Sequence, residues 1–194
     1  MAIDAPTRFD SLAGRLLVAM PGIGDPRFEH AVILVCAHQR DHAMGLRLDR
    51  PAPGVDLAGV LSKLNVEGAE HAPIQTVLAG GPVDKERGFV LHTSDWSVAD
   101  ASLMIGDDLA ITATKEALAA MTDPDIAPQR AILVLGYAGW GEGQLEEELT
   151  DNVWLTAEPS LDVLFDEDHG SKWRRALAGL GIDAAMLSAH AGRA

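Results

Sequence analysis

Short apolar runs rich in β-branched residues recur along this chain, and each ends at a turn signal. The clearest are RLLVAM (15–20), AVILVCAH (31–38), GFVLHT (88–93) and AILVLG (131–136). Runs of this length between glycine, proline or charged residues are typical of strands. The segments between them hold only short helix-like patterns, and no regular strand–helix–strand alternation is present. The sequence therefore predicts an α+β fold and not a doubly wound parallel sheet.

Two further patterns predict strands in more detail, one by its buried face and the other by its partner in a hairpin. In AMGLRLDRP (43–51) apolar residues alternate with Gly45, Arg47 and Asp49, which predicts a strand with one buried face that Pro51 closes. SLMIGDDLAIT (102–112) predicts a hairpin in which two apolar residues of each arm pair across the Gly-Asp-Asp turn.

Helices are predicted where a capping residue precedes an apolar periodic segment. Asp56, Thr114 and Ser171 are such residues. The helix after Ser171 places Trp173 toward the core and ends at Gly181. In the part of the chain before this helix, predicted strands outnumber predicted helices.

Composition restricts the class of protein. The 194 residues contain 29 acidic and 15 basic side chains, for a net charge of −14. An acidic surface repels phosphate backbones and anionic lipid, so neither nucleic acid nor membrane is an expected partner. A single cysteine, Cys36, fits a cytoplasmic location. With no linker in the chain, we expect a mobile N-terminal arm over residues 1–11 and a single domain over 12–194.

The segment GYAGWGEGQLEEEL (136–149) follows an apolar run and precedes a helix-like stretch, as phosphate-binding loops do. Its helix opens with three glutamates, and no lysine or arginine occurs between Arg130 and Lys172. Carboxylates there suit the helix dipole but would repel a bound anion. We therefore interpret the glycines as a tight turn, with Trp140 packed on the sheet and Leu145 on the buried helix face.

This segment, followed by NVW, resembles the signature of the bacterial YqgE/AlgH family. Other segments agree with the family in the same order: GRLLVAMPGIGDPRFEHAVILVCAH, AMGLRLDRP, GGPVDKERGFVLH and LFDEDHGSKWRRALAGLGID. The resemblance covers about residues 12–190. It implies a bifurcated, mostly antiparallel β-sheet that forms a pseudo-barrel with flanking short helices. It also implies a role in transcriptional regulation, which the family carries through its AlgH name.

The sequence departs from the family pattern at four positions. Ala37 stands where glutamate is common, Arg47 where an aliphatic residue is common, Asp49 where asparagine is common and Glu142 where proline is frequent. Any family chemistry that used that glutamate or asparagine would be missing here.

One candidate site is catalytic. Cys36 and His38 are two residues apart on a predicted strand, so their side chains should share a face. An enzyme of the hydrolase or transferase type could use this pair with His92. The alternative is that Cys36 is a small core residue within a buried run.

A second candidate is a ligand site at the Gly80-Gly81-Pro82 turn. Backbone N–H groups of such a turn, with Arg87 and His92 nearby, could take a carboxylate or a phosphate. The alternative is that both glycines serve an unusual backbone turn.

Neither a metal nor a cofactor is expected. His38 and His42 flank Asp41, but in a loop between strands, where a solvated turn is the usual outcome.

Lys172, Arg174 and Arg175 form a basic cluster beside an aromatic residue, which could touch nucleic acid but is more simply a solvated helix face. The interpretation favoured is a binding or regulatory module acting through a protein or small-molecule partner. Enzyme activity and direct DNA binding are the alternatives.

Overall fold

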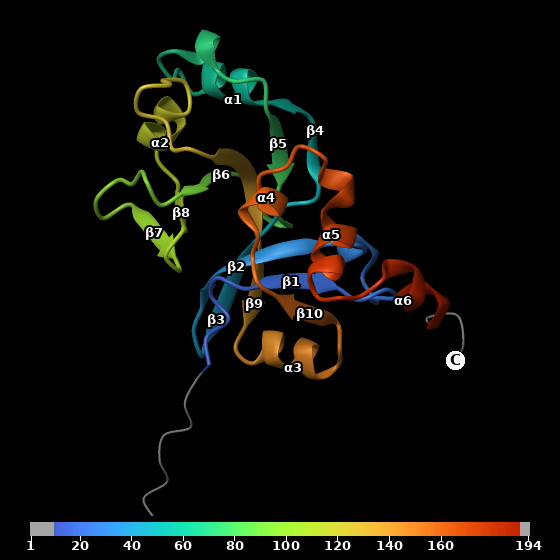
Figure 1. The fold of residues 1–194 in the computed structure, drawn as a ribbon. Helices are drawn as coiled ribbons and strands as arrows, with labels where there is room; N and C mark the ends of the chain where they lie inside the picture. The colour runs from blue at the N-terminus through green and yellow to red at the C-terminus, as the bar shows by residue number, and fades with distance from the viewer. Residues whose placement is uncertain (1–9, 191–194) are drawn as a thin grey trace, which may run out of the picture.

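The computed structural model describes residues 10–190 and shows a curled, mostly antiparallel sheet that forms a half-barrel with short helices around it (Figure 1). Its main path runs β10-β1-β2-β3-β9-β6-β8-β7, and β4 joins through β5. The predicted α+β class is therefore confirmed. Eight of the nine strand pairings within residues 10–190 are antiparallel, and the ninth, between β5 and β9, is parallel.

The strands have the following bounds: β1 Leu16–Ala19, β2 Val32–His38, β3 His42–Arg47, β4 Pro51–Asp56, β5 Thr76–Ala79, β6 Val83–Thr93, β7 Ser102–Ile105, β8 Leu109–Thr112, β9 Ala131–Gly141 and β10 Trp154–Ala157.

The sheet forks at β9. One edge of β9 pairs with β6, from Ala131 to Tyr137. The other edge pairs with β5 at Val134 and Leu135 and then with β3 from Ala138 to Gly141. Two different strands thus share one edge of β9, which gives the sheet its branched form.

The length of β9 corrects one prediction. Residues 136–141 continue the strand, and do not form the tight glycine turn expected there. Gly136 has φ +72°, a conformation that a residue with a Cβ rarely adopts, and the chain crosses close to the main chain of Val83 at this point. Trp140 and Leu145 are buried as predicted.

The helices are short. Their bounds are η1 Pro26–Phe28, α1 Leu57–Lys63, η2 Ala69–His71, α2 Lys115–Ala120, α3 Gln144–Thr150, α4 Leu161–Leu164, η3 His169–Ser171, α5 Lys172–Gly179 and α6 Ala184–His190. Asp56, Thr114 and Ser171 occupy the N-cap positions of α1, α2 and α5, as predicted.

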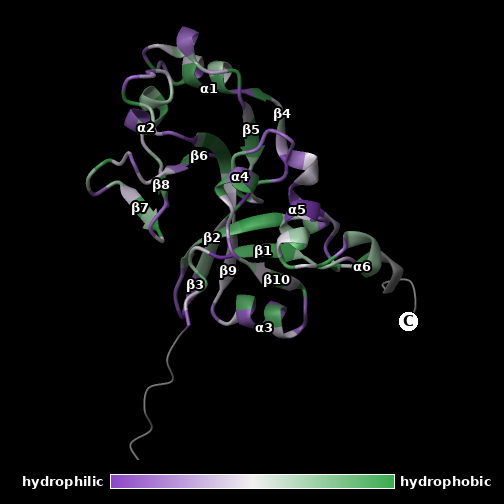
Figure 2. Ribbon diagram, in the orientation of Figure 1, coloured by the Kyte–Doolittle hydropathy of each residue, from purple (hydrophilic) through white to green (hydrophobic). Residues whose placement is uncertain are grey.

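Three apolar clusters hold these elements together, and they lie where Figure 2 shows apolar colouring on the strands. The first joins one face of β1 and β2 to α5 through Trp173 and Leu177. The second joins the opposite face of β1–β3 to α3 through Leu145. The third places α1 and α2 on β5, β6 and β9. Burial of both faces explains why the first strands are almost continuously apolar.

The predicted hairpin over residues 102–112 is confirmed, with Leu103 opposite Ile111 and Ile105 opposite Leu109. The strand predicted over 43–51 differs: β3 ends at Arg47, and Pro51 begins β4. Its expected solvent face is also buried, since Arg47 is 7% exposed.

The expected N-terminal arm lies outside the described residues except for Asp10 and Ser11. The Ser11 hydroxyl donates a hydrogen bond of 3.1 Å to the His38 carbonyl. In residues 10–190, no helix combines the length and apolarity that crossing a bilayer requires.

Candidate functional site

The glycine pair between β5 and β6 is explained by close backbone packing. The Gly80 N–H donates to the Leu135 carbonyl at 2.8 Å, and the Gly80 carbonyl accepts from the Arg47 N–H at 2.9 Å. A Cβ on Gly81 would lie 2.1 Å from the carbonyl carbon of Tyr137. The Gly80 N–H is therefore committed to the sheet and cannot also hold an anion.

Arg87 is exposed on β6, with its guanidinium 5.2 Å from the centre of the Phe89 ring. It lines a pocket of about 450 Å³ together with Tyr137 and Trp140. Gly81 lines a different pocket, of about 340 Å³. The structure thus does not bring Arg87 and the glycine turn to one pocket.

His92 lies on β6, opposite Ala110 of β8, and is fully buried. Its Nδ1 lies 2.9 Å from the Thr93 carbonyl, which can only accept, so Nδ1 carries the proton. Nε2 then accepts from the Thr112 hydroxyl at 2.9 Å, and Trp96 packs edge-on against the ring. Burial lowers the pKa of His92, which favours this neutral ring. The residue lies in the sheet interior and not at a pocket.

Cys36 and His38 do not share a face, and that prediction is wrong. The register of β2 against β3 shifts between Val35 and Ala37, and this bulge adds one residue to the alternation. Cys36 belongs to the cluster beneath α5, whereas His38 is opposite Ala43, which belongs to the cluster beneath α3.

Their partners also differ. The Cys36 thiol lies 3.5 Å from the Leu34 carbonyl, and burial raises the pKa of this thiol to about 12. His38 Nδ1 accepts from the Leu12 N–H, so Nε2 donates to the Glu146 carboxylate, each at 2.9 Å. A thiolate activated by His38 does not fit this arrangement.

The basic cluster on α5 is also different from the prediction. Lys172 is not on a solvated face: it is fully buried, and its ammonium donates to the carbonyls of Leu48 and Leu164. Arg175 forms an ion pair with Asp166 at 2.5 Å. Arg174 alone of the three is exposed.

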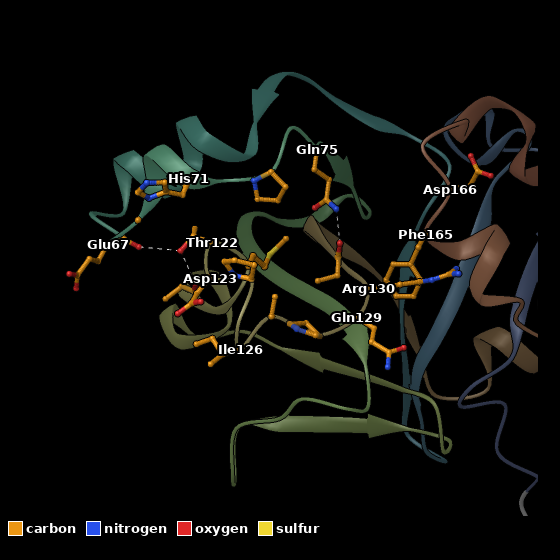
Figure 3. Close-up of a pocket in the computed structure, with 18 of the residues that line it drawn as sticks. Glu67, His71, Gln75, Thr122, Asp123, Ile126, Gln129, Arg130, Phe165 and Asp166 are labelled. Carbon is orange, nitrogen blue, oxygen red and sulfur yellow. Dashed lines mark hydrogen bonds between the residues drawn. The ribbon is translucent and has the colours of Figure 1, made fainter.

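A cleft of about 1300 Å³ lies between two walls that are distant in sequence (Figure 3). One wall comes from the segment between α1 and β5 and from the loop between α2 and β9. The other comes from α4, the turn after it and α5. In Figure 3 the residues of the first wall, such as His71 and Ile126, face Phe165 and Asp166 across the cleft.

The charges of the cleft are partly balanced. Arg130 pairs with Asp162 at 2.8 Å, a contact that links the two walls, and Arg175 pairs with Asp166. The other two acids of the lining, Glu67 and Asp123, have no ion pair within the described part of the chain. The cleft therefore carries an uncompensated charge of about −2 at the first wall, where these two residues lie.

The cleft also contains apolar surface and an unusual acceptor. Ile126 is 54% exposed, and Phe165 lies on the opposite wall. Gln75 donates from Nε2 to the Ala131 carbonyl at 2.6 Å, which fixes the orientation of its amide. Its buried Oε1 has no hydrogen-bond partner among residues 10–190.

The AlgH-like family model matches residues 16–185. The chain belongs to the AlgH-like family. A UPF0301 protein of Caulobacter vibrioides is 56% identical over 183 residues, 94% of each chain, and one of Paracoccus denitrificans is 44% identical over 186 residues, 95% of this chain and 97% of the other.

Solved structures agree. The solution structure of the AlgH protein from Pseudomonas aeruginosa is 38% identical to this chain, covers 100% of both chains and has a TM-score of 0.75. A crystal structure of protein DIP2367 from Corynebacterium diphtheriae shares the fold, with a TM-score of 0.69 over 88% of each chain at 19% identity. The resemblance found in the sequence motifs is therefore confirmed for the AlgH-like family.

The sequence motifs did not indicate the residues of the cleft. Its lining comes from four separate segments, and the only local signal is the proline-rich stretch TDPDIAPQ (122–129), which exposes one isoleucine. Nothing in that stretch indicates a particular chemistry. Only the folded structure shows that it lies opposite α4 and α5 across the cleft.

Proposed function

We propose that this AlgH-like protein is a binding and regulatory module whose partner is a segment of another protein, docked in the cleft between the α1/α2 wall and the α4/α5 wall. The size of the cleft carries this proposal. Pockets for small molecules usually measure roughly 300–1,000 Å³, whereas this one is about 1300 Å³. A segment of a protein chain would fill such a space with several side chains.

The chemistry of the cleft defines the partner. Glu67 and Asp123 favour a basic side chain, while Ile126 and Phe165 offer apolar contacts. A basic and apolar peptide segment meets both requirements.

This proposal accounts for a regulatory role without direct contact to DNA. Lys172 is buried and Arg175 is paired, so the basic cluster offers Arg174 alone to a phosphate backbone. With a net charge of −14, the protein has little means of releasing counterions from DNA. We place the activity in the cytoplasm, because a single buried cysteine fits a reducing compartment.

Affinity capture from native lysate tests the proposal when wild type is compared with variants. Glu67→Lys reverses a charge of the cleft, and Ile126→Glu removes its exposed apolar side chain. Asp151→Lys after α3 and Leu103→Glu on β7 are matched changes outside the cleft. We expect a partner protein that wild type and both controls retain and that both cleft variants lose.

A protein retained equally by all five baits would contradict docking in the cleft. Turnover of a small substrate by the purified protein, in a broad hydrolase and transferase panel, would contradict the binding-module proposal as a whole.

A further inference from the structure

The pocket of about 340 Å³ that Gly81 lines lies where β4 and β5 leave the main sheet. It takes side chains from η1, the end of β3, β4, the β5–β6 turn, β6 and β9. Four of its lining residues are cations and none is an acid: Arg27, Arg47, Arg50 and Lys85. The protein has almost twice as many acids as bases, so a pocket with this lining is not expected from average composition.

Two of these cations are already neutralised. Arg27 pairs with Asp25 at 2.6 Å, and the buried Arg47 pairs with Asp49 at 2.7 Å. Arg50 and Lys85 are exposed, and neither forms an ion pair with any residue that the structure describes. The pocket therefore holds an uncompensated charge of about +2, the amount that a small dianion would balance.

The paired arginine gives the pocket a fixed wall. The Arg47 guanidinium donates to both oxygens of Asp49 and to the carbonyls of Arg27 and Glu29. A guanidinium has five N–H groups, and these contacts occupy four, which leaves one on Nη1. Arg47 therefore lines the pocket as a rigid wall, with no side-chain freedom to lose when a ligand binds.

The rest of the lining is apolar. It consists of Phe28, Ala52, Pro53, Val55, Pro82 and Leu135, with small contributions from Ala79 and Gly81. A fully hydrated inorganic ion would leave this surface unused, while an organic ligand could cover it. The lining thus favours a molecule with a charged end and an apolar body.

We propose that this pocket binds a small organic dianion, whose charged group lies between Arg50 and Lys85 and whose apolar body packs against Phe28 and Leu135. The Gly80-Gly81-Pro82 turn borders the pocket through Gly81 and Pro82, but its partners are these cations and not Arg87.

Isothermal titration calorimetry with three probes at low ionic strength tests separately the contributions of the ligand's charged group and of its apolar body. Phenyl phosphate carries both, inorganic phosphate carries only the charge, and benzyl alcohol carries only the ring. We expect phenyl phosphate to bind about tenfold or more tightly than either of the others, because burial of an aromatic ring and charge-assisted hydrogen bonds both contribute. Added salt should weaken the binding of both phosphates.

Substitutions then locate the site. Arg50→Gln and Lys85→Gln should each weaken phenyl phosphate binding by about tenfold or more, since each removes a charged donor, and the double variant should lose it. Arg87→Gln is the matched control: Arg87 is an exposed cation on the same strand as Lys85, but it lines the other pocket. Its affinity should equal that of wild type. Arg50 and Lys85 are both exposed, so glutamine at either position should not disturb buried contacts, and circular dichroism verifies the fold.

Three results would overturn the proposal. The first is wild-type affinity in the double variant, the second is loss of binding in Arg87→Gln, and the third is equal affinity for benzyl alcohol and phenyl phosphate. The pocket and the cleft share no lining residue, so failure of one proposal leaves the other standing.

Discussion

Lys172 on α5 donates a hydrogen bond of 3.0 Å to the carbonyl of Leu48, 124 residues earlier in the chain. A second hydrogen bond, to the Leu164 carbonyl at 2.7 Å, holds the same ammonium between α4 and the β3–β4 connection. Burial lowers the pKa of Lys172 to about 8, although nearby carboxylates oppose the shift. This buried amine ties the C-terminal helices to the sheet.

The lowered pKa predicts how stability depends on pH. The folded protein releases the Lys172 proton near pH 8, and the unfolded chain releases it near 10.5. Between these values the unfolded state binds more protons, so the contribution of Lys172 to the free energy of unfolding rises as the pH increases through the window, and it is constant below it. Urea unfolding at several pH values measures the free energy of unfolding of wild type and of Lys172→Met. As the pH rises through this window, the free energy of wild type should increase relative to that of the variant. A difference that stays constant from about pH 8 to about pH 10 would contradict a buried, titrating amine.

Gly81 predicts a steric effect on folding. A Cβ added there would approach three main-chain atoms of Tyr137 and Ala138 at 2.1–2.4 Å, and main chain within a sheet cannot move aside cheaply. We expect Gly81→Ala to lower the free energy of unfolding by about 3 kcal/mol or more, or to prevent folding. Gly141→Ala is the control, because a Cβ at Gly141 would meet no atom within 4 Å. Equal thermal stability of the two variants would show that the close approach is relaxed in solution.

Local patterns in the sequence predicted the elements, but contacts between distant segments decided their surroundings. The hairpin at Ile105 and Leu109 and the cap at Asp56 depend on neighbouring residues, and both predictions are confirmed. Helical periodicity places Lys172 on a different face from Trp173, and this pattern predicted a solvated side chain. The carbonyl groups that accept hydrogen bonds from Lys172 lie in other segments of the chain, so the helix pattern could not indicate its burial.

The candidate sites show the same limit. The bulge that separates Cys36 from His38 leaves no mark in a uniformly apolar run. The anion pocket combines residues of η1, β4 and β6, so no local spacing could indicate it. The glycine turn in the sequence predicted that an anion could bind nearby. The cations that line the pocket beside this turn belong to other segments, so only the folded structure identifies them.

Cys36 should be chemically inert in the folded protein. It is 2% exposed, and with its pKa raised to about 12 almost none of it is thiolate at neutral pH. Iodoacetamide at pH 8 should therefore label the native protein at least about 100-fold more slowly than the urea-unfolded chain, where the thiol has its ordinary pKa of roughly 8.5. Mass spectrometry follows the labelling. Rapid labelling of the native protein would restore the enzyme alternative based on this cysteine.

The buried pair of Arg47 and Asp49 predicts a strong energetic coupling. Their side chains are only 8% and 10% exposed, and Asp49 also accepts from the Val32 N–H. Arg47→Leu would leave the carboxylate buried without its counterion, which should cost about 3–5 kcal/mol. An asparagine at position 49 carries no charge, and its side-chain oxygen can still accept from the Val32 N–H. The double variant Arg47→Leu/Asp49→Asn should therefore be more stable than Arg47→Leu alone.

A double-mutant cycle by urea unfolding measures this coupling, and the chain offers a matched control. Arg130 and Asp162 form an ion pair of similar length, 2.8 Å, but their side chains are 42% and 77% exposed. Water screens such a pair, so its cycle should give a coupling below about 1 kcal/mol. The Arg47–Asp49 cycle should exceed this several-fold, because neither charge can be solvated when its partner is removed. Equal couplings in the two cycles would mean that water reaches the buried pair, and that the wall of the anion pocket is not rigid.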